Sequence, residues 1–338
     1  MKIANVPLKK ISAYFVWFTS LALLWASFFS IATAQSWNPA NGTFNGSGGF
    51  TATEINDWIG PQFSANNGGE LTFAGNAEHT GQTAVESGSS VIIGGSLNHT
   101  NAFQRFVVSG SDGAGGFSSL SIEDPANSDV ISASFQLDNT SLSLNSITTG
   151  STVVRLEAQL DVIEDLDSDG VTSIESGAQV SVGGALNHTN AFQRFVVSGT
   201  DGAGGFSSLS IGDPDNSDVI SASFQLDNTS LALNSITTGS TVVRNGAQLD
   251  VIGELSSSGV TSIESGAQVS VGDSFNHTNA FERFVVSGSD GAGGFSSLSI
   301  EDIINSNVNS ASFQLDNTSL GLNSITTGST VVLSLIHI

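Results

Sequence analysis

The chain has 338 residues, with 8 lysines and arginines against 31 aspartates and glutamates, a formal net charge of −23, and no cysteine. Without cysteine, a thiol nucleophile, a disulfide and a cysteine-ligated metal are excluded. Eight basic side chains are too few to build the basic face that phosphate groups require. We therefore expect no nucleic acid partner.

Residues 1–34 have the three-part layout of a secretory signal peptide. Residues 1–10 carry all three lysines of the chain, residues 11–31 are a long apolar run, and Ala-Thr-Ala at residues 32–34 supplies small residues before a cleavage site. The apolar run is near spanning length, so an uncleaved membrane anchor is the alternative. We expect cleavage and an exported protein, extracellular or on the outer cell surface, with no transmembrane segment in the mature chain.

A repeat of 89 residues dominates the rest of the sequence. The string Asn-His-Thr-Asn begins at Asn98, Asn187 and Asn276, and residues 171–211 and 260–300 differ at only 5 of 41 positions. The first unit is the most diverged at its start, as terminal units of repeat proteins commonly are. The chain therefore divides into an N-terminal cap and three units, at residues 35–65, 66–154, 155–243 and 244–332.

A shorter period of 20 residues lies inside each unit. Residues 241–251 align with residues 261–271, and the second unit repeats the match. These segments alternate apolar and polar residues, which is typical of a half-buried strand. Gly246 and Gly266 precede two of the strands, where a tight corner needs a residue that tolerates positive φ.

Both periods together predict an all-β fold, a β-solenoid (parallel β-helix) with coils of about 20–25 residues. About four coils per unit, each advancing about 4.8 Å, would make three units a rod of roughly 60 Å. The alternative is a row of tandem β-sandwich modules, because the unit has nearly the size of an immunoglobulin domain. The 20-residue repeat favours the solenoid, because a β-sandwich is not built from repeated coils.

The solenoid predicts which side chains stack across neighbouring coils. Three pairs of residues, each 20 positions apart, should become ladder neighbours separated by roughly 5 Å. These pairs are Arg155 with Glu175, Arg244 with Glu264, and Gln159 with Gln179.

One acidic segment has the opening pattern of a calcium loop. Asp165, Asp167 and Asp169, followed by Gly170, match the start of the D-x-D-x-D-G type. The closing carboxylate should be the twelfth residue, which is Ser176. We therefore expect a solvated acidic turn between coils, keep a calcium site as the alternative, and expect no other cofactor.

The repeated histidines invite a metal or general-base interpretation. His99, His188 and His277 recur at the unit spacing, so successive copies should lie too far apart to share one metal ion. We expect each to be a polar histidine at a corner of a coil.

Two further strings occur in every unit. Asn-Ala-Phe, then Gln or Glu, then Arg-Phe-Val-Val is expected to supply core phenylalanines, with its arginine paired to a nearby acid; these arginines are Arg105, Arg194 and Arg283. Asp-Gly-Ala-Gly-Gly-Phe, which begins at Asp112 in the first unit, predicts a turn before a strand.

Catalysis is disfavoured by the same repetition. A hydrolase resembling polygalacturonase would need an Asp-Asp pair, a Gly-His-Gly and an Arg-Ile-Lys, and none of these strings occurs. A catalytic centre is normally single, whereas nearly every polar residue here has two copies. We expect no enzymatic activity, with a polysaccharide lyase or hydrolase as the residual alternative.

Residues 36–41 (Ser-Trp-Asn-Pro-Ala-Asn) and 265–272 (Ser-Gly-Ala-Gln-Val-Ser-Val-Gly) resemble bacterial surface proteins with autotransporter-associated strand repeats, including those with a C-terminal sorting signal. The resemblance implies a pectin-lyase-like β-helix displayed outside the cell. With the repeats, it predicts a non-catalytic structural or adhesive protein whose partner is an extracellular glycan or a host or neighbouring cell surface. The alternative is a carbohydrate-binding or carbohydrate-active β-helix.

The last residues depart from the repeat. Position 333 should be arginine by comparison with Arg244, but residues 333–338 read Leu-Ser-Leu-Ile-His-Ile. This string matches the in-frame translation of a transposase sequencing adapter. We therefore expect residues 333–338 to be an artefact and the chain to be a fragment of a longer protein.

Overall fold

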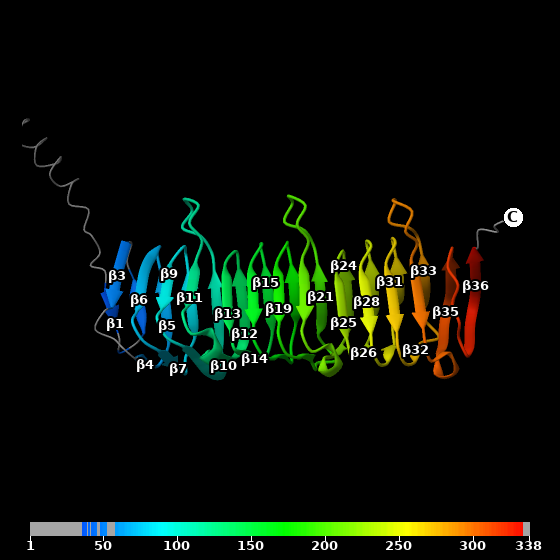
Figure 1. Cartoon of the computed structure of the whole chain (residues 1–338), viewed down its shortest axis with the longest axis horizontal. Coiled ribbons are helices and arrows are strands. Elements are labelled where there is room, and N and C mark those ends of the chain that lie inside the picture. The colour runs from blue at the N-terminus through cyan, green and yellow to red at the C-terminus, as the bar shows by residue number, and fades with distance from the viewer. Residues whose placement is uncertain (1–35, 39, 41, 46–47, 53–57, 334–338) are drawn as a thin grey trace, which may run out of the picture.

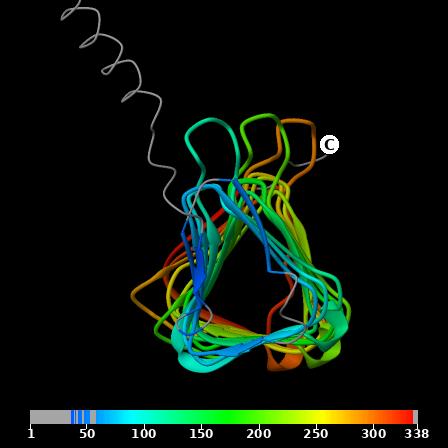
Figure 2. The same cartoon turned by 90° about the vertical axis from the view of Figure 1, so that its left-hand side faces the viewer.

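The computed structural model describes residues 36–333, apart from residues 39, 41, 46–47 and 53–57. The expected signal peptide and residues 334–338 lie outside this part of the chain. The described residues form a parallel β-solenoid of about 14 turns, seen along its length in Figure 1 and end-on in Figure 2. The predicted fold class is confirmed.

A regular coil has three short strands, one on each face of a roughly triangular section (Figure 2). One such coil consists of β17 (Leu166–Ser168), β18 (Thr172–Glu175) and β19 (Gln179–Val182). In the next coil they pair, parallel and in register, with β20 (Leu186–His188), β21 (Arg194–Ser198) and β22 (Ser208–Ile211). We call the faces that carry β17, β18 and β19 face 1, face 2 and face 3.

The remaining strands occupy the same three faces. Face 1 also holds β4 (Trp58–Gly60), β7 (Ala77–His79), β14 (Ser146–Thr149), β23 (Asp218–Ser221), β26 (Ser235–Thr238), β29 (Leu255–Ser257) and β32 (Phe275–His277). Face 2 also holds β2 (Thr43–Asn45), β5 (Phe63–Asn66), β8 (Thr83–Glu86), β15 (Thr152–Arg155), β24 (Ser223–Asp227), β27 (Thr241–Arg244), β30 (Thr261–Glu264) and β33 (Arg283–Ser287). Four long strands run from face 1 onto face 2: β10 (Leu97–Ser109), β12 (Asp129–Asp138), β35 (Asn307–Asp316) and β36 (Ser324–Leu333).

Face 3 is divided into three sheets of four strands each. The first sheet contains β3 (Gly48–Ala52), β6 (Gly69–Phe73), β9 (Ser90–Ile93) and β11 (Ser119–Ile122). The second contains β13 (Ser141–Leu144), β16 (Gln159–Val162), β19 and β22, and the third contains β25 (Ser230–Leu233), β28 (Gln248–Val251), β31 (Gln268–Val271) and β34 (Ser297–Ile300). Three 3₁₀ turns, η1 (Pro125–Asn127), η2 (Pro214–Asn216) and η3 (Ile303–Asn305), follow the last strand of each sheet, and β1 (Ser36–Asn38) pairs antiparallel with β2.

Strand pairing continues without a break from one 89-residue unit to the next. The boundaries after residues 154 and 243 fall inside β15 and β27, which both pair with strands on either side. A unit is therefore a spacing within one continuous solenoid. The alternative of separate β-sandwich modules is wrong, because a sandwich would interrupt the parallel ladder at each boundary.

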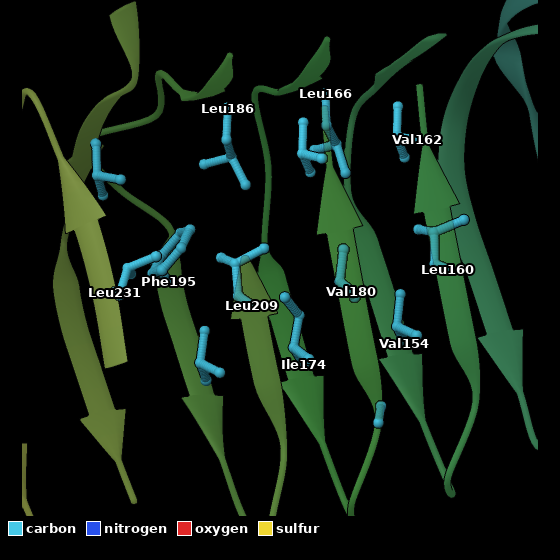
Figure 3. Close-up of a cluster of buried hydrophobic side chains, with 14 of the residues drawn as sticks. Val154, Leu160, Val162, Leu166, Ile174, Val180, Leu186, Phe195, Leu209 and Leu231 are labelled. Atoms are coloured by element: carbon cyan, nitrogen blue, oxygen red, sulfur yellow. The ribbon is translucent and has the colours of Figure 1, made fainter. Parts of the chain in front are cut away.

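The core is the space between the three faces, and it is filled by residues at alternate strand positions. Leu160, Val180 and Leu209 come from successive coils of face 3, are register partners, and are at most 3 % exposed. Figure 3 shows such side chains pointing inward from neighbouring strands. Since each residue stacks on its counterpart one coil away, burial of apolar surface accumulates along the whole rod.

Stacked phenylalanine rings reinforce this core once per unit. The ring centroids of Phe195 and Phe224 are 5.3 Å apart and the rings are nearly parallel, at 2°. Phe106 with Phe135 and Phe284 with Phe313 repeat the arrangement at 5.0 and 5.1 Å. The second phenylalanine of each Asn-Ala-Phe-x-Arg-Phe string is therefore in the core, as predicted.

The first phenylalanine of that string is not in the core, so half of the prediction is wrong. Phe103, Phe192 and Phe281 are 89, 89 and 90 % exposed. Phe103 lies where the register of β10 shifts, between Asn101 and Arg105. The extra residues at this shift form a bulge within β10, and the equivalent residues of the other two units form a turn, so the first phenylalanine is carried away from the core.

Positive φ angles mark the corners ahead of the face 3 strands, as expected for the glycines there. Gly246 and Gly266 have φ of +73° and +80°. A Cβ built on Gly266 would lie 2.6 Å from the Cβ of Asp290, whereas one built on Gly246 meets nothing within 4 Å. The two corners therefore share a backbone conformation and differ only in their neighbours.

This difference predicts unequal costs for one substitution. Gly246→Ala should lower the free energy of unfolding by roughly 1–2 kcal/mol, the cost of left-handed backbone at a residue with a Cβ. Gly266→Ala should cost clearly more, because the loop that contains Asp290 must also move. Urea denaturation of both variants checks this, and equal costs would contradict the packing described for Gly266.

Candidate functional site

The residues 20 positions apart lie on neighbouring strands. Gln159 and Gln179 are register partners on face 3. On face 2, Val154 pairs with Ile174, so Arg155 and Glu175 occupy the next ladder position. The carboxylate of Glu175 adds a favourable charge interaction that helps to raise the pKa of Arg155. Eighty-nine residues later, Val243 and Ile263 pair in the same way, and they precede Arg244 and Glu264.

The hydrogen-bonded partner of Arg155 is nevertheless a different acid. Its Nε donates to Oδ1 of Asp138 at 2.8 Å and its Nη2 to Oδ2 at 3.3 Å. This bidentate contact is the main reason why the pKa of Arg155 is raised. Arg244 binds Asp227 in the same way, at 2.8 and 3.2 Å. The sequence did not reveal these aspartates, because the coil between Asp138 and Arg155 spans 17 residues and the repeat that aligned the other strands spans 20.

The glutamates of the predicted ladder contact the other set of arginines. The Oε1 of Glu175 lies 3.6 Å from Nη2 of Arg194, and Glu264 lies 3.7 Å from Arg283. The corresponding contact in the first unit, Glu86 to Arg105, is 3.5 Å. Each arginine in the part of the chain that the structure describes therefore has an acidic partner.

The acidic segment is extended, not a turn. Asp167 lies in β17, with Asp165 and Asp169 just outside its ends. Asp165 Oδ1 accepts the backbone N–H of Ala185 at 2.8 Å, and Asp167 Oδ1 accepts a hydrogen bond from Asn187 at 3.1 Å. A strand does not wrap oxygen ligands around one ion as a calcium loop does. Among the described residues, no group of three or more His, Cys, Asp or Glu side chains is arranged to hold a metal ion.

The histidines are buried, which corrects the expectation of a polar corner. His188 ends β20, is 0 % exposed, and its Nδ1 is hydrogen-bonded to Oγ1 of Thr172 at 2.9 Å. His277 and Thr261 repeat the contact at 3.0 Å. In the first unit, Thr83 bonds to two rings at once, His79 at 2.9 Å and His99 at 3.0 Å. A threonine of face 2 therefore hydrogen-bonds one nitrogen of each inward-pointing imidazole, while the second ring nitrogen of each is buried with no hydrogen-bond partner among the described residues.

Burial also sets the charge of these histidines. It lowers the pKa of His79 to about 3, with repulsion from His99 as a further cause, and lowers the pKa of His99 and His188 to about 4. The pKa of His277 is lowered for the same reason. A neutral, fully buried histidine cannot reach a substrate in solution, so these side chains act on stability.

The loops between face 2 and face 3 project from one edge of the rod in a row (Figures 1 and 2). Each is closed by its own aspartate. In the first loop, Asp112 Oδ1 accepts the backbone N–H groups of Ala114 and Gly116 at 2.7 and 2.9 Å. These hydrogen bonds lower the pKa of Asp112, and the bond from Ala114 has the largest effect. The predicted turn is present, and its carboxylate is occupied within the loop.

The outer surface of face 3 carries two troughs, each lined by both polar and apolar residues. The first is about 360 Å³ and is lined by Gln159, Asp161, Gln179, Ser181 and Ser208 among others. The second is about 530 Å³, and the same residue types line it 89 positions later, at Gln248, Asp250, Gln268, Ser270 and Ser297. Amides, hydroxyls and one carboxylate per trough offer hydrogen bonds to a hydroxyl-rich ligand. No arginine or histidine lines either trough.

Comparison with known proteins gives no match: no family model, no curated protein and no solved structure corresponds to this chain. The resemblance to autotransporter-associated repeats and the sorting signal therefore stay predictions. Among the described residues, no helix has the length and apolar character that crossing a membrane would require.

The two classes of ion pair predict different costs. Arg155→Ala should lower the free energy of unfolding by about 1–3 kcal/mol, because the nearly buried Asp138 carboxylate loses its cationic partner and keeps only the hydrogen bond from Gln136. Arg194→Ala should cost at most about 1 kcal/mol, since both partners of its longer contact are solvated. Chemical denaturation checks this, and Asp138→Asn introduced with Arg155→Ala should recover part of the loss. Equal costs for the two arginine variants would contradict it.

The buried histidines predict a stability that depends on pH. The unfolded chain takes up protons below a pKa of about 6.5, whereas folded His99 and His188 stay neutral down to about 4. The unfolded state therefore binds more protons in this window, and the free energy of unfolding should fall as pH drops from 6.5 to 4, by up to about 1.4 kcal/mol per pH unit and histidine.

Denaturation between pH 7.5 and 4.5 measures this slope, and His188→Asn should reduce it by the contribution of one proton. Asp169 partly opposes the effect at His188, because its negative charge raises the pKa of that histidine. A free energy of unfolding that stays constant across this range would show that the imidazoles are accessible to protons in the folded rod.

Proposed function

We propose that the protein is a non-catalytic, extracellular structural or adhesive rod. The observation that carries this proposal is repetition in space: side chains 89 residues apart present the same polar groups on the same face of one continuous solenoid. Gln159, Asp161 and Gln179 line one trough, and their counterparts line the next. Identical weak contacts along a rigid rod gain strength through multivalency, without any single strong site.

The absence of catalysis is supported by the state of the candidate groups. The histidines are buried and hydrogen-bonded to threonines, and the arginines of the described residues are engaged by acids. Secretion is supported by the signal-peptide pattern of residues 1–34. The amides, hydroxyls and carboxylates in the troughs, with no arginine or histidine among the lining residues, favour a glycan or a glycan-coated cell surface over a polyanion as the partner.

A register-preserving deletion tests the adhesive role. Removal of residues 155–243 joins Val154 to Arg244, which reproduces the Val243–Arg244 junction within a β27-like strand. The shortened rod should therefore fold. Retention of protein-coated beads on a panel of immobilised polysaccharides and on cultured cell layers should fall more than in proportion to the loss of one unit.

A second deletion of the same length, residues 170–258, joins Asp169 to Gly259 and also preserves the 89-residue spacing. It removes one unit at a different junction, so it should behave identically if the number of units sets the retention. Incubation of the intact protein with the same polysaccharides should release no reducing ends. Release of oligosaccharides would refute the non-catalytic assignment. Retention that does not depend on the number of units would refute adhesion by multivalency.

A further inference from the structure

Three phenylalanines are held in water at identical places on the rod. Phe103, Phe192 and Phe281 are 89–90 % exposed, although burying such a ring is strongly favourable. Each lies at the junction of face 1 and face 2, two residues after the last asparagine of the Asn-His-Thr-Asn segment. With about four coils per unit, successive rings follow one another at roughly 19 Å along the rod, which is four strand spacings.

The turn that carries each ring is anchored to the preceding coil. Asn190 Oδ1 accepts the backbone N–H of Phe192 at 2.9 Å, while its Nδ2 donates to the carbonyl oxygen of Asp169 at 2.5 Å. Asn101 and Asn279 make the equivalent bonds to Phe103 and Phe281, at 2.9 and 3.0 Å. Because the asparagine fixes the turn from both sides, the exposed ring needs little further ordering when it meets a ligand.

A groove of about 470 Å³ lies on face 1 between the first and the second of these turns. Ala102, next to Phe103, stands at one end, and Thr189, close to Phe192, stands at the other. Between them the groove is lined by Ile131, Thr148, Thr149, Asp167 and Asn187 among others. Its size is within the range of ligand sites, and its lining mixes one exposed apolar side chain with hydroxyl, amide and carboxylate groups.

We infer that the exposed phenylalanines, together with the groove between the turns of Phe103 and Phe192, form a binding site for a neutral polysaccharide that lies along the rod. One face of a pyranose ring carries C–H groups that pack against an aromatic ring, while its hydroxyls hydrogen-bond with groups such as Thr148, Asp167 and Asn187. A polymer can contact successive rings at once, which a small ligand cannot. This inference rests on the proposed adhesive function and names its ligand class and its site.

Charge selects among the possible occupants. The groove lining contains Asp167 and Asp169 and no arginine or histidine, so a polyuronate would meet uncompensated repulsion. A second copy of this chain carries the same net charge of −23, which opposes lateral association. A neutral, hydroxyl-rich chain incurs neither cost.

Affinity gel electrophoresis of the full chain tests the inference, with hydroxyethyl cellulose and dextran as neutral probes and polygalacturonate as the anionic probe. At least one neutral probe should retard the protein, and polygalacturonate should not. The triple variant Phe103→Ala/Phe192→Ala/Phe281→Ala should abolish the retardation. Each single variant should weaken apparent binding by on the order of 10-fold or more, because one of three linked contacts is lost.

The matched control replaces the phenylalanines of the projecting loops, Phe117→Ala/Phe206→Ala/Phe295→Ala, which are about half exposed and lie outside the groove. This variant should bind as the unaltered chain does, and circular dichroism should show both triple variants folded. Failure of both neutral probes to retard the chain, equal retardation by polygalacturonate, or full binding by the first triple variant would each overturn the inference.

Sedimentation of the unaltered chain tests whether a second copy of the chain, instead of a polysaccharide, binds the exposed phenylalanines. A dimer that the Phe103→Ala/Phe192→Ala/Phe281→Ala variant loses would assign the rings to self-association and overturn the polysaccharide assignment. In the bead assay, the 155–243 deletion tests adhesion independently. If that deletion weakens adhesion while the triple variant does not, the proposed function stands and the ligand site lies elsewhere.

Discussion

Parallel, in-register stacking is the constraint on which the rest of this structure depends. Once Val180 lies between Leu160 and Leu209, the register of all the remaining positions in that strand is set as well. Inward positions are apolar or form hydrogen bonds inside the rod, as the bond between His188 and Thr172 illustrates. Outward positions are free to vary, and repetition of the unit turns each of them into a row along the rod.

The same constraint explains how an acidic rod avoids repulsion between neighbouring coils. Asp161 has Ser143 and Ser181 as its register partners, and Asp250 has Ala232 and Ser270. Where acids do come close on face 2, arginines lie between them. At Asp161 and Asp250 the register therefore places a neutral residue on each side of the aspartate.

Features that can contact a partner are concentrated where the coils depart from the minimal length. The longer coil of each unit accommodates both the turn that carries an exposed phenylalanine and the loop closed by an aspartate. These insertions add nothing to the core, and the strands on both sides keep their pairing. A solenoid can accept such insertions at its corners because a corner belongs to no ladder.

The sequence by itself determined the fold class, the 20-residue register and the positive-φ corners, because a period and an alternation are local properties of a chain. It could also place Gln159 beside Gln179. Only the tertiary structure decided that Asp138 binds Arg155, that His188 points into the core, and that Phe192 is exposed while Phe195 is buried. These outcomes depend on the lengths of intervening coils and on what lies across the interior, and a repeated string contains neither.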